Sequence, residues 1–494
     1  MTVTKIFTSF VFLLWGWGEG AVASLNEDST VCKEKNNCNF HHVLSDYREE
    51  LSKIAIDYTV LGKEILPQVE VYRYEMTSQS WAPDKMVTPG KWQHSVDIYI
   101  PNMPKEQRAL VVVNNGINYV SNAEDRKKPT DFSEEVLVDI ARKTHTIVIS
   151  VSDTPNQYLT YQSDGKLLKE DDSVARSWLL FMNDPEKRKL MPLHIPMSAS
   201  VSQAMRMAKK ELMKWNVNKF IVTGVSKRGW ATWLTAISNP DVEAIIPFAI
   251  DLLDTDVALA HMYRSYGENW PVAFYPYYKN GIDKLVKTPG FLRLMEIEDP
   301  LKYMVSIYRS RLDIPKYIVN ASGDDFYTPD NSRFYYERLP GEKSLRVIPN
   351  TDHYGVKKFT EQSIVSFVNR YQTKRELPKI DSFVNGKTVM VSFSEMPVNI
   401  TRWTAINTRA RDFRYACNIR YTASSVDLPL DDKVEIPLNY TNSGWEATYI
   451  EATFNDGYVG TTQVYITPDD KYANVAPPSE GPTCQTLPGR GLGD

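Results

Sequence analysis

Short, continuously apolar runs separated by amphipathic stretches fill the chain between about residues 65 and 375. Six such runs lie at 109–114, 146–151, 219–223, 244–250, 316–320 and 345–349. Runs of this length suit parallel strands that helices cover on both faces. Helical spacing of apolar positions fills most of the gaps, at 131–144, 201–214, 228–237, 332–338 and 360–374. The pattern predicts an α/β fold with a mostly parallel, doubly covered sheet.

Two earlier segments, Val69–Met76 and His94–Ile100, alternate polar and apolar residues, which predicts an antiparallel pair ahead of the parallel series. This order is the plan of an α/β-hydrolase, which we place at residues 65–375. Two gaps, 152–200 and 252–314, are too long for simple crossovers, so we interpret them as insertions that cover the site. The second is rich in aromatic residues and is either a lid or wall of the site or a small satellite core.

The pattern changes after Pro378. Short strand-like segments separated by turn residues, with no helical stretch between them, predict a β-sandwich over residues 379–475. The Pro- and Gly-rich residues 476–494 are predicted to form a loose tail. Residues 24–64 are left as a separate N-terminal segment.

The N-terminus has the features of a secretory signal peptide. One lysine precedes the apolar run IFTSFVFLLW, and the small residues Ala21-Val22-Ala23 follow it. About 10–14 apolar residues are too few to span a bilayer comfortably. We therefore expect a signal peptide at residues 1–23, cleavage after Ala23, an extracellular protein and no membrane span.

Cysteine usage agrees with an oxidising compartment. The four cysteines, Cys32, Cys38, Cys417 and Cys484, make disulfides plausible and allow three pairings. Pairing Cys32 with Cys38 and Cys417 with Cys484 keeps each bond within its own region. The sequons at Asn399 and Asn439 are expected to be glycosylated. A third sequon, at Asn320, ends an apolar strand and is expected to be buried.

Charge and composition exclude several classes of partner. The 494 residues carry a formal net charge of −4. No cluster of lysine and arginine interleaves with aromatic residues, which argues against a nucleic-acid partner. The seven histidines show no ligand spacing with one another or with the cysteines. No metal site and no cofactor is predicted.

The stretch "FIVTGVSKRGWATWLTA" contains the candidate nucleophile, Ser226. It follows an apolar strand and precedes a helical stretch, as the serine of a nucleophile elbow does. The usual pattern is G-x-S-x-G, whereas here the second glycine stands one place later, at Gly229. Alone, the motif indicates a capped helix start much more readily than a nucleophile.

Acidic and histidine residues follow the next strands in the order that this fold requires, serine then acid then histidine. An acid-bearing loop follows residues 316–320, and His353 follows residues 345–349. Together with Ser226 they predict a catalytic triad. Asp324 fits the acid position best; Asp325 and Asp330 are close rivals, and Asp251 is a distant one.

Three further features complete the predicted site. The oxyanion hole would use the backbone N–H of Lys227 and one from the loop around Gly116. Arg228 either binds an acidic substrate or, more simply, forms a salt bridge to a neighbouring helix. The acidic pair Glu170 and Asp171 either anchors the positive end of a substrate or forms a solvated helix start.

The segments "GVSKRGWATWLTA", "HMYRSYG", "DPLKYM", "LPGEKSLRVIPNTDH" and "GWEATYIEATF" closely resemble the PhoPQ-activated pathogenicity-related proteins, whose eukaryotic branch includes autocrine proliferation repressors. The resemblance runs from residue 77 to about residue 468. It implies an α/β-hydrolase-like fold with a C-terminal β-domain, and it places Ser226, Asp324 and His353 at the positions of the family's triad. The eukaryotic branch is associated with secreted signals that restrain proliferation and with dipeptidyl-peptidase-like activity.

Two functions follow as hypotheses. The first is a secreted serine hydrolase that cleaves an ester or peptide bond and restrains cell proliferation. The second is a non-catalytic autocrine signal that acts through a cell-surface receptor. The three residues that a triad needs favour the first hypothesis, and the two are compatible because an extracellular signal can also be an enzyme.

Overall fold

The computed structural model describes residues 35–118, 127–162, 164–428, 432–440 and 443–493. The predicted signal peptide at residues 1–23 lies outside the described residues, and so does Cys32. The predicted Cys32–Cys38 disulfide is therefore outside the described part of the chain.

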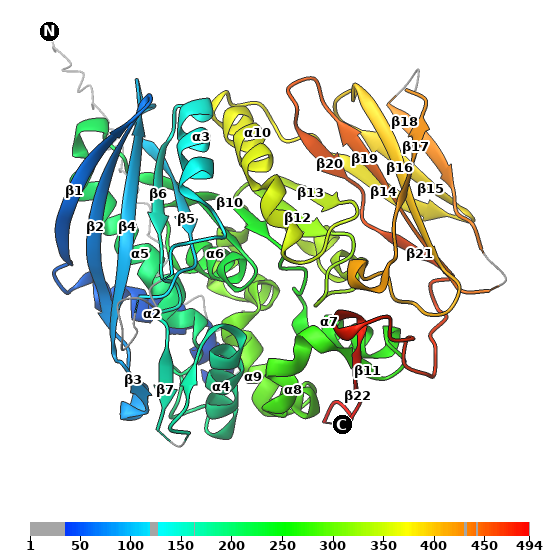
Figure 1. Cartoon of the computed structure of the whole chain (residues 1–494), viewed down its shortest axis with the longest axis horizontal. Helices are drawn as coiled ribbons and strands as arrows, with labels where there is room; N and C mark the ends of the chain where they lie inside the picture. The colour runs from blue at the N-terminus through cyan, green and yellow to red at the C-terminus, as the bar shows by residue number, and fades with distance from the viewer. Residues whose placement is uncertain (1–34, 119–126, 163, 429–431, 441–442, 494) are drawn as a thin grey trace, which may run out of the picture.

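A nine-stranded sheet forms the centre of the molecule, with strand order β1-β2-β4-β6-β5-β9-β10-β12-β13 (Figure 1). The six strands from β6 to β13 run parallel, and they are the six apolar runs of the sequence. β2 and β4 pair antiparallel, as predicted. The strands are β1 Asp57–Leu66, β2 Val69–Ser80, β4 Lys91–Pro101, β5 Arg108–Val113, β6 Ile147–Val151, β9 Lys219–Val225, β10 Val242–Phe248, β12 Lys316–Ala321 and β13 Lys343–Ile348. This sheet confirms the predicted α/β-hydrolase-like architecture.

Helices cover both faces of the sheet, which explains the continuous apolar runs. Along β5, Val111 and Val113 belong to one apolar cluster, whereas Leu110 and Val112 belong to another. Successive side chains of a strand point to opposite faces, so a strand that is buried on both faces is apolar at every position. On one face α3 and α10 pack together, and α5 and α6 lie on the other (Figure 1). These helices are α3 Glu134–Thr144, α5 His194–Glu211, α6 Lys227–Ser238 and α10 Thr360–Gln372.

The structure differs from the predicted boundaries at the N-terminal end of the sheet. Residues 57–64, assigned above to a separate segment, form most of β1, which pairs antiparallel with β2. The strand was missed because nearly all of its side chains are exposed, so it lacks the alternation of a half-buried strand. A second difference lies at 332–338, where two short 3₁₀ turns replace the expected helix.

Both insertions follow strands of the parallel set, at the edge of the sheet where the carboxyl ends of these strands meet. The first, 152–200, contains β7 Leu159–Tyr161, β8 Leu167–Leu168 and α4 Glu170–Asn183 before α5 begins. The second, 252–314, contains α7 Thr255–Ser265, β11 Asn269–Pro271, α8 Tyr275–Lys279 and α9 Pro289–Glu298. Figure 1 shows α4, α8 and α9 gathered at this end. None of the described helices has the length and apolarity needed to cross a membrane.

The C-terminal region consists of antiparallel sheets, in the order β14-β15-β18 and β17-β16-β19-β20, with β21 paired to β19. Apolar side chains from both sheets, including Val391, Val434 and Ile450, belong to one cluster. Two antiparallel sheets that share an apolar interior have the arrangement of a β-sandwich. The strands are β14 Ile380–Asn385, β15 Thr388–Phe393, β16 Asn399–Asn407, β17 Thr422–Val426, β18 Lys433–Pro437, β19 Trp445–Thr453, β20 Val459–Thr461 and β21 Tyr465–Thr467.

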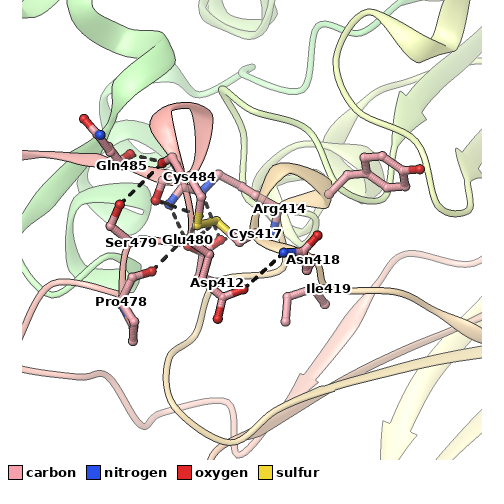
Figure 2. Close-up of a disulfide and its surroundings, with 12 residues drawn as sticks. Asp412, Arg414, Cys417, Asn418, Ile419, Pro478, Ser479, Glu480, Cys484 and Gln485 are labelled. Atoms are coloured by element: carbon pink, nitrogen blue, oxygen red, sulfur yellow. Dashed lines mark hydrogen bonds and ion pairs between the residues drawn. A yellow bond between two sulfur atoms is a disulfide. The ribbon is translucent and has the colours of Figure 1, made fainter.

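The end of the chain is not the loose tail that its Pro and Gly content suggests. Strand β22, Thr486–Pro488, pairs with β11 of the second insertion. The predicted disulfide between Cys417 and Cys484 is present and fixes the start of this segment (Figure 2). A high Pro and Gly content shows only that the tail has little tendency to form helix or strand by itself. The tail is ordered because a disulfide and strand pairing attach it to distant segments.

Candidate active site

Ser226 lies on a sharp turn between the end of β9 and the start of α6. Its backbone has φ 58° and ψ −127°, a strained conformation for a residue with a side chain. A Cβ atom on Gly224 would lie 2.6 Å from the carbonyl oxygen of Arg228, and one on Gly229 would lie 2.8 Å from that of Phe248. The turn therefore needs both glycines. The later position of the second glycine follows from the close approach of α6 to β10.

His353 and Asp324 meet Ser226 at the carboxyl edge of the sheet. The Ser226 Oγ and His353 Nε2 atoms are 2.8 Å apart, and His353 Nδ1 lies 2.9 Å from Asp324 Oδ2. Because a carboxylate accepts at Nδ1, the neutral imidazole carries its proton there and its Nε2 accepts from the serine hydroxyl. The structure brings the three predicted residues together in the geometry of a catalytic triad.

Asp324 is held in place by its own loop. Its Oδ1 atom accepts hydrogen bonds from the backbone N–H groups of Phe326 and Tyr327, at 2.8 and 3.3 Å. Burial disfavours the charged form of His353, but Asp324 outweighs burial and raises the pKa of His353 above its usual value. The histidine is therefore oriented by a fixed carboxylate that also stabilises its imidazolium form.

The other aspartates considered for the acid position have different partners. Asp330 binds Arg411 and His261, with an Oδ2–Nη2 distance of 2.6 Å to the arginine. Asp251 accepts from the Tyr335 hydroxyl at 2.6 Å. The pKa of Asp325 is raised to about 6, first by burial and then by the neighbouring Asp324 and Asp352. Among the described residues, Asp324 is the aspartate hydrogen-bonded to His353.

The two predicted oxyanion positions follow neighbouring strands of the parallel sheet, β9 and β5. Lys227 is the first residue of α6, so its backbone N–H has no partner within the helix. Gly116 lies in the loop after β5, which is the parallel neighbour of β9. Its φ is 139°, and a Cβ atom there would lie 2.3 Å from Asp153 Oδ1. Only glycine fits this position, because the loop packs tightly on the segment that follows β6.

Glu170 and Asp171 form the first turn of α4, as one of the two readings of the sequence predicts. They are only partly exposed, however, at 31% and 17% of their side-chain surface. Lys227 Nζ lies 2.8 Å from Glu170 Oε2 and 3.3 Å from Asp171 Oδ2, and Arg228 Nη2 lies 2.6 Å from Glu170 Oε1. The predicted salt bridge of Arg228 to a neighbouring helix is thus present. Both carboxylates are occupied by cations of the chain itself, which disfavours a role as an anchor for a substrate amine.

A narrow cavity of about 20 Å³ lies beside Ser226. Asp171 and Lys227 also line it, and they pair with each other. The other lining side chains are aromatic or aliphatic: Trp178, Trp230, Leu252, Leu259, Met262, Phe274, Tyr277, Phe326 and Tyr327. The second insertion supplies Leu252, Leu259, Met262, Phe274 and Tyr277. Two of its aromatic residues, Phe274 and Tyr277, therefore form part of the wall of the candidate site.

Two residues that link the insertions to each other and to the Gly116 loop, Gln157 and Tyr277, could not be identified from the sequence. Gln157 bonds to both Gly116 and Glu170, and the Tyr277 hydroxyl donates to Asp171 Oδ1 at 3.1 Å. Local sequence gives no signal for either contact, because each joins segments that are distant along the chain.

One described group could bring three potential ligand atoms close enough for a metal ion: Asp412, Cys417 and Cys484. The two sulfur atoms are bonded to each other, and Asp412 pairs with Arg414 at 2.7 Å (Figure 2). Neither cysteine therefore has a free thiolate that could bind an ion, and the group fixes the tail instead. Asn399 and Asn439 are exposed, whereas Asn320 is buried, as expected for the three sequons.

Comparison with known proteins shows which family the chain resembles. Autocrine proliferation repressor protein A of Dictyostelium discoideum is 27% identical over 409 residues, which are 78% of this chain and 80% of that protein. Among solved structures, an acetyl xylan esterase from Paenibacillus sp. R4 is similar with a TM-score of 0.45 at 13% identity, covering 70% of this chain and 98% of the esterase.

Acetyl xylan esterase 1 from Thermoanaerobacterium sp. JW/SL YS485 is similar with a TM-score of 0.43 at 12% identity, covering 66% and 93% of the two chains. The model of the PhoPQ-activated pathogenicity-related proteins matches residues 44–414. That match includes Ser226, Asp324 and His353 and confirms the resemblance found in the sequence. The chain belongs to the PhoPQ-activated pathogenicity-related protein family.

Proposed function

We propose that this protein is a serine hydrolase that cleaves an ester or peptide bond. One observation carries the proposal: Ser226 Oγ lies 2.8 Å from His353 Nε2, whose other ring nitrogen lies 2.9 Å from Asp324. The strained backbone of Ser226 supports it further, because such strain persists where it serves a site.

The proposed reaction uses these three side chains and two backbone groups. Ser226 Oγ attacks the carbonyl carbon while His353 Nε2 takes the hydroxyl proton. The N–H groups of Lys227 and of the Gly116 loop stabilise the oxyanion. His353 then gives its proton to the leaving alcohol or amine, which leaves an acyl group on Ser226. A water molecule then gives a proton to His353 and attacks the acyl group, and His353 returns the proton to Ser226 Oγ as the acid leaves.

The size and lining of the cavity beside Ser226 indicate a substrate that places a small, uncharged group in this cavity. Its two charged lining residues, Asp171 and Lys227, pair with each other, so neither offers a free charge to a ligand. Its volume of about 20 Å³ is close to what one water molecule needs. A methyl-sized group would fill it without displacing the aromatic wall.

The compartment and biological role belong to the same proposal. The signal-peptide pattern at residues 1–23 and the Cys417–Cys484 disulfide support secretion. The similarity to an autocrine proliferation repressor supports an extracellular signal that restrains proliferation, through its activity or through a cell-surface receptor.

Labelling with a fluorophosphonate, followed by mass-spectrometric site mapping, tests the enzyme proposal. We expect the label on Ser226, and no label on Ser226→Ala, because the oxygen atom that attacks phosphorus is gone. The matched control is Ser366→Ala, which removes a hydroxyl on α10 and should label like the wild type. A folded wild-type protein that never labels would rule out the hydrolase.

The same variant separates the two biological roles. If the signal acts through hydrolysis, purified Ser226→Ala added to responsive cells loses the restraint on proliferation. If the signal acts through a receptor alone, the variant restrains proliferation as the wild type does.

A further inference from the structure

Glu170 stands at the meeting point of three segments that surround the nucleophile. Its Oε2 atom accepts from Lys227 Nζ at 2.8 Å, and its Oε1 atom accepts from Arg228 Nη2 at 2.6 Å. Oε1 also accepts from Gln157 Nε2 at 2.8 Å. One carboxylate thus holds the two residues that follow Ser226 and a glutamine from the segment after β6.

Gln157 carries this link to the candidate oxyanion loop. Its Nε2 atom also donates to the carbonyl oxygen of Gly116 at 3.2 Å. Its Oε1 atom accepts from the backbone N–H of Glu170 at 2.7 Å, so the glutamine and Glu170 bind each other twice. A chain of hydrogen bonds therefore runs from the nucleophile turn through Glu170 and Gln157 to Gly116.

The two cations of this hydrogen-bond network are buried, the Glu170 side chain is 31% exposed, and the charges are balanced locally. The side chains of Lys227 and Arg228 are 8% and 4% exposed. Arg228 also pairs with Asp131 at 3.2 Å and donates to the carbonyl oxygen of Thr154 at 2.6 Å. Burial disfavours the charged form of Glu170, but Arg228 and Lys227 outweigh it and hold the pKa of Glu170 far below its usual value. The Glu170 carboxylate is therefore an anion held by three short bonds, and the backbone N–H of Glu170 makes a fourth.

The contacts of Glu170 are specific within its helical turn. Asp172, two residues later, pairs instead with Lys279 of α8 at 2.6 Å. That pair ties α4 to the second insertion and reaches neither Lys227 nor Arg228. The two acids share a helical turn and a type of interaction, and they differ in whether they bind the nucleophile turn.

We propose that Glu170 is a positioning residue that, through Gln157, sets the Gly116 loop against the nucleophile turn. This inference rests on the proposed hydrolase function. The two oxyanion donors follow different strands, β9 and β5, and must be held at a fixed separation for both to reach one oxygen atom. The bonds of Glu170 and Gln157 supply that constraint without contacting the substrate.

The test follows inactivation of the whole protein by a fluorophosphonate, because the phosphoryl oxygen occupies the place of the oxyanion. The rate constant of inactivation at saturation, kinact, and the half-saturation concentration, KI, are measured for Glu170→Gln and Gln157→Leu. A displacement near 1 Å costs about 100-fold in rate, so we expect kinact to fall by about 10- to 100-fold with KI nearly unchanged. The control Asp172→Asn should keep both constants.

The double variant Glu170→Gln/Gln157→Leu distinguishes a shared role from two separate defects. Because both residues belong to one chain of bonds, the double variant should lose no more than the worse single variant. The inference fails if kinact of folded Glu170→Gln matches the wild type, if the two losses multiply, or if Asp172→Asn loses as much. Absence of labelling in the wild type would instead remove the proposed function itself.

Discussion

Two buried aspartate–histidine pairs arise from one loop of this protein. Asp324 binds Nδ1 of His353, with 2.9 Å between the closest atoms, and Asp330 lies 3.1 Å from Nε2 of His261. The four side chains are at most 3% exposed. The two pairs thus have the same residue types, nearly the same burial and nearly the same distance between carboxylate oxygen and ring nitrogen.

The pairs differ in what occupies their remaining atoms. Arg411, fully buried, binds Asp330 Oδ2 at 2.6 Å, and the Tyr472 hydroxyl lies 3.3 Å from the second nitrogen of His261. Burial disfavours the charged form of Asp330, but Arg411 and His261 outweigh it and hold the pKa of Asp330 well below its usual value. Arg411 and Tyr472 therefore occupy the polar atoms of this pair that face away from the aspartate–histidine contact. The pair links α7 to the C-terminal region.

The Asp324–His353 pair has a nucleophile at its open end. The second nitrogen of His353 faces Ser226, and among the described residues Asp324 forms no ion pair with a lysine or arginine. Its charge is therefore not neutralised by a described lysine or arginine, and the carboxylate binds the histidine and two backbone N–H groups. An aspartate–histidine contact by itself is no evidence of catalysis; the groups at its two ends decide its role.

The largest expected effect comes from removing the proposed catalytic histidine. His353→Ala removes the base that takes the Ser226 proton, so we expect fluorophosphonate labelling to fall by a factor of about 10⁴ or more. The matched change at the other pair, His261→Ala, should leave labelling of the folded fraction within about twofold. Equal losses in the two variants would contradict the division of roles.

Asp330→Asn should instead act on stability. It leaves buried Arg411 with Asp469, which is 55% exposed and 4.0 Å away, in place of its close partner. Loss of one partner of a buried pair costs about 3–5 kcal/mol of unfolding free energy. Chemical denaturation of purified protein measures this cost, and labelling of the folded protein should persist.

A second substitution sharpens this result. Replacing both charges, in Asp330→Asn/Arg411→Met, removes the unpaired guanidinium and should recover most of the lost stability. If the double variant is less stable than Asp330→Asn, the loss does not arise from an unpaired buried charge.

The smallest effect is a shift in pH dependence. His353 must be neutral to act as a base, so the labelling rate should fall on the acidic limb of its pH profile, where His353 becomes protonated. The pKa of His353 is raised above the usual value of about 6.5, so this limb lies above that pH. Asp171 is a further carboxylate that raises this pKa. Asp171→Asn should therefore move the limb to lower pH. Asp330→Asn should leave it in place, and an upward shift in Asp171→Asn would contradict the electrostatic account.

The parallel sheet could be predicted from the sequence because each of its inner strands is buried on both faces and is apolar throughout. Strand β1 could not, since its side chains are mostly exposed on both faces. The C-terminal tail escaped prediction for a related reason. Its order depends on the Cys417–Cys484 disulfide and on pairing with β11, and neither leaves a local pattern.

The candidate triad was predictable because the chain order of serine, acid and histidine is a property of the fold. Choosing among Asp324, Asp325, Asp330 and Asp251 rested on loop spacing, and the partners of Asp330 and Asp251 became visible only in three dimensions. The balanced cluster around Glu170 was also hidden, because Lys227, Gln157 and Glu170 belong to separate segments.

The comparison of Asp324→Asn with Asp330→Asn tests the central claim most directly. Both variants remove one carboxylate from a buried aspartate–histidine pair in the same loop, and kinact for a fluorophosphonate is measured on the folded fraction of each. We predict a loss of about 10⁴-fold for Asp324→Asn, because its histidine then takes the wrong tautomer, and a change within about twofold for Asp330→Asn. Equal losses, or a larger loss in Asp330→Asn, would contradict the assignment of Asp324, His353 and Ser226 as the catalytic set.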